Sequence, residues 1–103
     1  MLTESLSAEE VIATLRAHED ELRRAGIMSL SLFGSVARGE ADLESDVDLV
    51  GRLDPRAELD LVDLVRLERL LGAVLGRAVD LVTEPIRKPR LLRNIERDRV
   101  HVF

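Results

Sequence analysis

The 103-residue sequence predicts an α+β domain, in which helices flank a mixed β-sheet of about four strands. Two long stretches carry apolar residues at helical spacing, and short apolar runs of strand length lie between and after them. Gly and Pro residues separate most of these segments. Because helical and strand patterns alternate along the chain, we expect a single domain over residues 1–103 with helices packed against one sheet.

The first helix is predicted over residues 8–25. Ser7 has the position of an N-cap and Glu10 that of the N3 residue in a capping box. Apolar residues then recur every three or four positions, and Gly26 is a suitable C-terminal stop. His18 falls on the apolar side of this helix, where we interpret it as a half-buried packing residue.

The strands are predicted from short apolar runs bounded by turn residues, at residues 27–33, 47–53, 78–82 and 100–103. Between the first two strands we expect a short helical turn over residues 36–39 and a polar loop over residues 40–45. These assignments give a sheet whose strands are separated by helices or loops.

Two further helices complete the expected fold. Asp54 and Pro55 suit the N-cap and N1 positions of a long helix that ends at Gly76. Apolar residues of this helix do not share one stripe, so it is either buried on several sides or carries a dimer or partner surface. A short helix is predicted over residues 90–97.

The composition excludes several classes of protein. The chain has no Cys, which excludes disulfides and thiolate zinc sites and fits a reducing cytoplasm. No apolar run is long enough to span a bilayer, so we expect a cytoplasmic protein without a membrane segment. A net charge of −5 and an aromatic content of 2% disfavour nucleic-acid binding. We interpret the basic residues within 87–99 as a solvated helix face; the alternative is a contact surface for an acidic partner, RNA or the nucleotide.

Three aspartates are candidates for catalysis and metal binding. Asp46 and Asp48 are two residues apart at the start of a predicted strand, which points both carboxylates to one face. A divalent cation would relieve their mutual repulsion, and carboxylate oxygens are ligands that magnesium prefers. Asp80 interrupts an apolar strand, where an acid is costly unless it is paired or bound to metal. In the alternative interpretation these are acids that face solvent.

If the two strands that carry these residues are neighbours, the carboxylates of Asp46, Asp48 and Asp80 form one cluster. Such a cluster can hold two metal ions across a displacement at phosphorus. One ion would orient a triphosphate, and the other would activate the attacking hydroxyl. Asp80 is then the base or a further metal ligand.

Gly34 and Ser35 are candidates for binding phosphate. They follow a predicted strand and precede a helical turn. Glycine lets the backbone approach a phosphate closely, and N–H groups at a helix start favour anions. The Walker pattern is absent, and a Gly-Ser turn alone is common; its spacing of about a dozen residues to Asp46 makes it informative.

Arg38 and Ser45 are secondary candidates for the nucleotide site. Arg38 would either contact the triphosphate or brace the loop through Asp42 or Glu44. Ser45 precedes Asp46 and could orient it by a hydrogen bond to the backbone.

The stretch of residues 33–50 contains Gly-Ser-x-Ala-Arg-Gly-x-Ala-x-x-x-Ser-Asp-x-Asp-Leu and resembles the minimal nucleotidyltransferases (MNT proteins) of bacteria and archaea. These belong to the superfamily that includes DNA polymerase beta. Its hallmark is a Gly-Ser or Gly-Gly turn, an Asp-x-Asp pair and a later Asp, which match Gly34-Ser35, Asp46-x-Asp48 and Asp80. The resemblance implies a nucleotidyltransferase fold, magnesium, and ATP or another nucleoside triphosphate as substrate.

The smallest members of this family are similar to antitoxins that neutralise a HEPN-domain toxin, in some cases by transferring AMP to a toxin tyrosine. The resemblance therefore implies an enzyme that adenylylates a partner protein. One alternative is a binding module that neutralises its partner by contact alone. Another is an enzyme that modifies a small molecule such as an antibiotic, which the lack of an acceptor domain disfavours. Because this chain lacks the acceptor domain of larger relatives, the acceptor surface would come from a partner or from a second copy of the chain.

Overall fold

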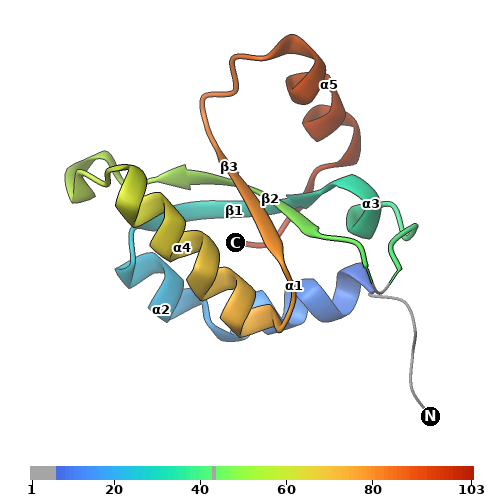
Figure 1. Cartoon of the computed structure of the whole chain (residues 1–103), viewed down its shortest axis with the longest axis horizontal. Coiled ribbons are helices and arrows are strands. Elements are labelled where there is room, and N and C mark those ends of the chain that lie inside the picture. Colours follow the sequence, from blue (N-terminus) through green and yellow to red (C-terminus); the bar gives the residue numbers. More distant parts are fainter. Residues whose placement is uncertain (1–6, 43) are drawn as a thin grey trace.

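The computed structural model describes residues 7–42 and 44–103, and Figure 1 shows their arrangement. The helices are α1 (Ala8–Ala17), α2 (Glu19–Arg24), α3 (Gly34–Ala37), α4 (Leu61–Leu75) and α5 (Pro89–Asp98), with one 3-10 turn, η1 (Pro55–Ala57). The strands are β1 (Ile27–Phe33), β2 (Val47–Leu53), β3 (Val79–Thr83) and β4 (Val100–His101). Every predicted strand is therefore present, with bounds that shift by one or two residues at β3 and β4.

The four strands form one mixed sheet in the order β3-β2-β1-β4. β1 is antiparallel to both β2 and β4, whereas β2 and β3 are parallel. The parallel pair is possible because α4 carries the chain back across the sheet between β2 and β3. This topology confirms the predicted mixed sheet with flanking helices.

The sheet separates two hydrophobic cores of unequal size. Figure 1 shows α1, α2 and α4 on one side of the sheet and α5 on the other. Because side chains alternate along a strand, Leu49 of β2 points into the large core with Leu15 and Leu71. Val50 points the opposite way, into a small core with Ile95 of α5. The small core therefore anchors α5 to the face of β2 that also carries Asp48.

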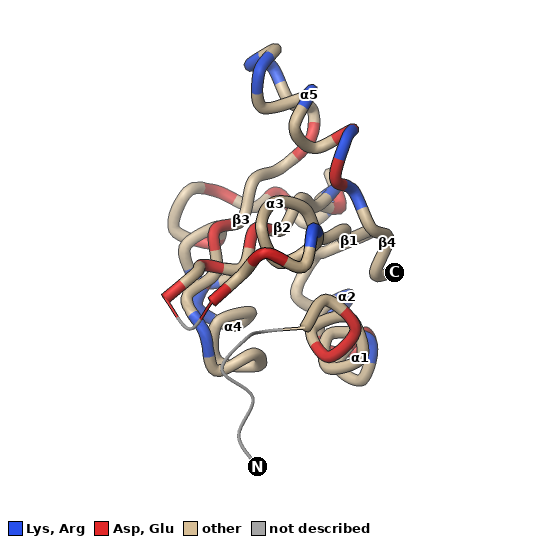
Figure 2. Tube along the Cα trace, turned by 90° about the vertical axis from the view of Figure 1, so that its right-hand side faces the viewer, with Lys and Arg blue, Asp and Glu red and all other residues tan. Residues whose placement is uncertain are grey.

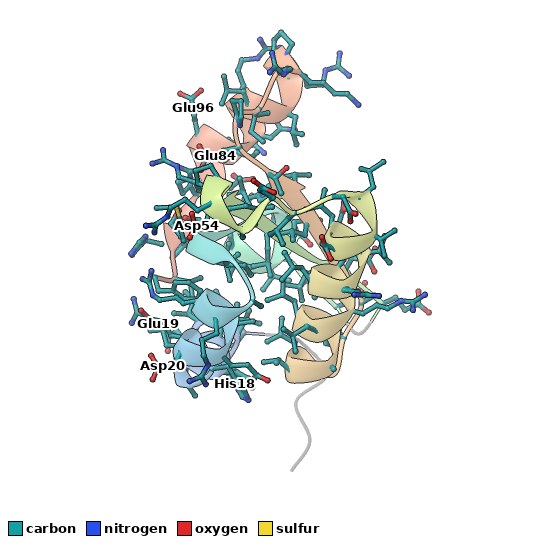
Figure 3. All side chains as sticks on the ribbon, turned by 90° about the vertical axis from the view of Figure 1, so that its left-hand side faces the viewer. His18, Glu19, Asp20, Asp54, Glu84 and Glu96 are labelled. Carbon is teal, nitrogen blue, oxygen red and sulfur yellow. The ribbon has the colours of Figure 1, made fainter. Side chains whose placement is uncertain are left out.

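The first helix is interrupted at His18, which corrects the predicted single helix over residues 8–25. His18 has φ −108° and ψ 14°, outside the helical range, and its Nδ1 lies 2.9 Å from the carbonyl oxygen of Thr14. The ring therefore takes the place of the continuing backbone at the end of α1. His18 is half-buried, as predicted, and Figure 3 shows it at the end of the molecule opposite α5.

The long helix begins later than predicted. Asp54 does cap a turn, since its Oδ1 accepts the N–H of Arg56 at 2.9 Å, but this turn is the short η1. Glu58 then takes a left-handed conformation with φ 51°, which ends the turn. α4 starts after Asp60, where Asp60 and Asp63 form a reciprocal capping box.

The surface of α4 is apolar on two sides. Leu67 and Leu71 are buried against the large core, whereas Leu61, Val62 and Val65 are 79%, 60% and 50% exposed. Burial on several sides is therefore wrong for this helix, and a partner or dimer surface stays a prediction. Among the helices of the described residues, none is long and apolar enough to cross a membrane.

Candidate active site

The strand register places Asp48 directly opposite Asp80. Asp48 pairs with Asp80 across the parallel β2–β3 ladder and with Phe33 across the antiparallel β1–β2 ladder. Residues opposite each other in adjacent strands point to the same face, with about 4.8 Å between the strands. The condition on which the carboxylate cluster depended, that these two strands are neighbours, is therefore met.

Asp48 has a raised pKa, and the causes identify its surroundings. Partial burial of the carboxyl group raises the pKa most, followed by the negative charges of Asp80 and Asp46. The positive charge of Arg38 offsets part of this effect. Three carboxylates and one guanidinium therefore act on one another at this edge of the sheet.

Gly34 fits closely against the Asp48 carboxylate. A Cβ atom at Gly34 would overlap Oδ2 of Asp48 and lie 3.1 Å from its Cγ atom. Gly34 also has φ +77°, a left-handed conformation that favours glycine. The predicted phosphate turn and the predicted metal ligand are thus in direct contact, although they are fourteen positions apart in sequence.

α3 continues directly from β1 and begins at the turn of Gly34 and Ser35. Phe33 precedes it and offers no side chain to cap the first N–H groups of the helix. N–H groups at a helix start carry partial positive charge and suit an anion. The predicted phosphate turn therefore lies beside the carboxylates, and its Ser35 is half-buried.

Asp80 does not have the buried environment that the sequence suggested. β3 is an edge strand, and Asp80 is solvent-exposed on it. The expected cost of burying this acid is therefore absent, and its approach to Asp48 rests on the register alone. The carboxylate of Asp80 is therefore accessible from solvent.

The three aspartates form an open edge rather than a closed cage. Within residues 7–42 and 44–103, no three His, Asp or Glu side chains converge as a preformed metal-binding group. Figure 2 shows acidic residues along the loop into β2 and at β3. Magnesium commonly takes one or two protein carboxylates together with substrate phosphates and water, so this open arrangement fits that ion.

Arg38 is held by partners that the sequence did not predict. Its Nη1 donates to Oδ2 of Asp98 at 2.6 Å, and its Nε donates to Oε1 of Glu40. The predicted bracing contacts to Asp42 or Glu44 are absent from the bonds of this side chain. Arg38 has these partners because α5 packs beside α3 and brings the buried carboxylate of Asp98 within its reach.

Ser45 forms a hydrogen bond to the backbone, as predicted, and closes the loop before β2; that this bond orients Asp46 stays a prediction. The Ser45 hydroxyl accepts the N–H of Asp42 at 3.0 Å and lies 3.2 Å from Asp42 Oδ1. Arg77, which sequence reasoning missed, donates through Nη2 to the carbonyl oxygens of Asp42 and Ser45 at 2.8 Å each. Arg77 therefore braces the loop that leads to the carboxylates, the role that had been considered for Arg38.

The basic residues near the C-terminus are mostly exposed, as expected for a solvated face. Two of them form ion pairs, Arg97 with Asp98 and Arg99 with Glu84. Asp98 is the residue that sequence reasoning missed here. No local signal marks it, because its importance comes from the packing of α5 against α3.

Comparisons with known proteins agree with this geometry. The nucleotidyltransferase domain family matches residues 15–102. A protein adenylyltransferase, MntA, of Thermococcus cleftensis is 39% identical over 98 residues, which cover 94% of this chain and 97% of that protein. A proposed protein adenylyltransferase of Methanocaldococcus jannaschii is 35% identical over 95 residues, or 90% of this chain and 95% of the relative.

Solved structures share the fold. A proposed minimal nucleotidyltransferase superposes with a TM-score of 0.66 at 36% identity, covering 86% of this chain and 93% of the other. The complex of a tri-AMPylated Shewanella oneidensis HEPN toxin with its MNT antitoxin has a chain that superposes with a TM-score of 0.63 at 20% identity, covering 89% and 71%. At that identity the second likeness shows the fold alone.

The matched family spans the phosphate turn, the Asp-x-Asp pair and the third aspartate. The register and close packing described above bring Gly34, Asp48 and Asp80 together at one edge of the sheet. The chain therefore belongs to the nucleotidyltransferase family, as an enzyme of its minimal type.

Proposed function

We propose that this chain transfers AMP from ATP to a partner protein in a magnesium-dependent reaction, and that the partner is a HEPN-domain toxin. The observation that carries the proposal is the contact of Gly34 with Asp48, with Asp80 in register beside it. The relative from Thermococcus cleftensis, named as a protein adenylyltransferase, supports AMP as the group transferred. The shared fold with an MNT antitoxin bound to a HEPN toxin supports the choice of partner. We place the reaction in the cytoplasm.

In this reaction a hydroxyl oxygen of the acceptor attacks the α-phosphorus of ATP. The new O–P bond forms while the bond to the leaving pyrophosphate breaks. N–H groups at the Gly34–Ser35 turn would hold the β- and γ-phosphates. Asp80 would accept the proton of the hydroxyl, a role supported by its exposure and its position opposite Asp48.

Asp46, Asp48 and Asp80 are the residues that would hold magnesium, as one ion or two. When bound, magnesium supplies positive charge that stabilises the developing negative charge on the phosphates. Burial, and then the negative charges of Asp80 and Asp46, raise the pKa of Asp48, which supports a cation site at these carboxylates. Ligands in that state gain most from a cation.

The test uses ATP labelled on the α-phosphate, magnesium, and a purified HEPN protein as acceptor. Wild type is compared with Asp46→Asn/Asp48→Asn, and Asp20→Asn serves as a matched control on α2. Figure 3 shows Asp20 at the far end of the molecule from α5. We expect label on the acceptor with wild type and with the control, and none with the double variant. Label that persists in the double variant would contradict the proposal.

A second candidate function is neutralisation by contact alone. The exposed Leu61, Val62 and Val65 on α4 favour it, because an apolar surface of this kind suits a protein partner. The discriminating variant is Asp46→Asn/Asp48→Asn/Asp80→Asn. If this variant still neutralises the toxin, contact is sufficient and catalysis is not the cause. If only wild type neutralises it, the catalytic proposal stands.

A further inference from the structure

Asp98 is a buried carboxylate outside the predicted site. It is the last residue of α5, and its side chain is 2% exposed. Among the described residues, it is the one acidic residue in the buried class. A buried charge is costly unless ionic partners and hydrogen bonds compensate it, so the partners of Asp98 explain its presence.

Two arginines compensate Asp98 from different elements. Arg97 donates from Nε to Oδ1 at 2.8 Å and from Nη2 to Oδ2 at 3.1 Å. Arg97 belongs to α5 itself, so this pair lies within one helix. The side chain of Arg97 is 60% exposed. Arg38 donates from Nη1 to Oδ2 at 2.6 Å and comes from the end of α3, 60 positions away in sequence. Asp98 thus joins α5 to the element that begins with the phosphate turn.

Arg38 is tied to that turn through its backbone. Its N–H donates to the carbonyl oxygen of Gly34 at 3.1 Å and closes the single turn of α3. The side chain is 38% exposed, so one edge of the guanidinium meets the buried Asp98 while the other reaches Glu40 at the surface. The anchored edge fixes the direction of the guanidinium, and its charge acts on Asp48.

We propose that Asp98 is a positioning residue for the nucleotide: through Arg38, it holds a positive charge beside the Gly34–Ser35 turn. The inference rests on the proposed function, because it assumes that the triphosphate binds at this turn. Asp98 itself does not touch the nucleotide. Without Asp98, Arg38 keeps only its exposed partner Glu40, and the guanidinium samples several directions. A preorganised cation binds phosphate more tightly than a mobile one.

The test measures the dissociation constant for ATP with magnesium by titration calorimetry, in the absence of acceptor. The proteins are wild type, Asp98→Asn, Arg38→Gln, the double variant, and Arg97→Gln as matched control. We expect binding about tenfold weaker for Asp98→Asn and at least as weak for Arg38→Gln. The double variant should bind like Arg38→Gln, because Asp98 acts only through Arg38. Arg97→Gln also removes bonds to Asp98, but should bind within about twofold of wild type.

Three results would overturn the inference. Asp98→Asn could bind ATP as wild type does, or the losses of the two single variants could add in the double variant. If Asp98→Asn does not fold, Arg38→Gln and Arg97→Gln carry the test, and equal weakening by both would contradict it. Failure of wild type itself to bind ATP would overturn the proposed function as well, which distinguishes the two failures.

Discussion

Replacing Gly34 by Ala tests the contact between the phosphate turn and the carboxylates. The added Cβ atom would overlap Oδ2 of Asp48 and lie 3.2 Å from its Cβ atom. This neighbour is the short side chain of a residue near the start of β2, whose backbone pairs with Phe33 of β1 and Asp80 of β3. The carboxylate must therefore rotate or shift, and a catalytic position changes with it.

The substitution has two separable costs. A left-handed conformation at a residue with a Cβ atom costs about 1–2 kcal/mol, which for a domain of this size lowers the unfolding midpoint by roughly 5–15 °C. Displacing a catalytic group by about 1 Å can cost around 100-fold in rate. We therefore expect Gly34→Ala to fold with reduced stability and to lose about two orders of magnitude of AMP transfer.

Gly76→Ala is the matched control. Gly76 has φ +66° at the end of α4, and a Cβ atom there would meet nothing within 4 Å. It carries the same kind of backbone strain without the overlap with Asp48. Thermal unfolding and the transfer of labelled AMP are measured for both variants. If Gly34→Ala retains a transfer rate within about twofold of Gly76→Ala, the reasoning about the contact is refuted.

Three further predictions concern Asp48, the loop brace Arg77 and the buried Asp98. Asp48→Asn should abolish AMP transfer and raise the thermal unfolding midpoint at neutral pH. The midpoint rises because burial and the charges of Asp80 and Asp46 raise the pKa of Asp48, so that its ionised form destabilises the fold. This gain should disappear as the pH falls below the ordinary value of 3.8, and a lower midpoint at pH 7 would contradict it. Arg77→Ala should lower the free energy of unfolding in urea by about 1–2 kcal/mol, because two carbonyl oxygens of the loop lose their donor. It should also raise the KM for ATP. An unchanged KM would show that the loop does not need Arg77 to hold it in place. The hydrogen bond from Arg97, together with Arg38 and against the effect of burial, lowers the pKa of Asp98 to about 2. The stability that Asp98 contributes should therefore be complete above pH 3.8 and disappear as the pH falls through about 2. The measurement is the difference in free energy of unfolding between wild type and Asp98→Asn. The same difference at pH 6 and at pH 2 would contradict this assignment.

The parts of the fold that could be predicted from the sequence are those with local causes. β1 and β2 were predicted with their observed bounds, because each is a short apolar run between turn residues. The N-cap at Ser7 was also predicted, and its hydroxyl accepts the N–H groups of Glu9 and Glu10. The stop at Gly76 follows from the left-handed conformation that glycine adopts easily.

The errors occur where a local hydrogen bond or turn ends a helical segment that the residue pattern would continue. The pattern over residues 8–25 is continuous, yet His18 breaks the helix by turning its ring to the carbonyl of Thr14. Asp54 and Pro55 have the right residue types for a helix start, but the turn that they begin ends at Glu58. In both places the local pattern favoured a longer helix than the chain forms.

The sequence by itself determined the candidate site residues of this enzyme: the Gly34–Ser35 turn, an Asp-x-Asp pair and a later aspartate. These follow from residue types and short spacings, which act over a few positions of the chain. Only the tertiary structure decided that Asp80 lies exposed on an edge strand opposite Asp48. The tertiary structure also decided that Asp98 holds Arg38. This ion pair joins residues 60 positions apart and depends on how α5 packs against α3, so no local sequence pattern indicates it.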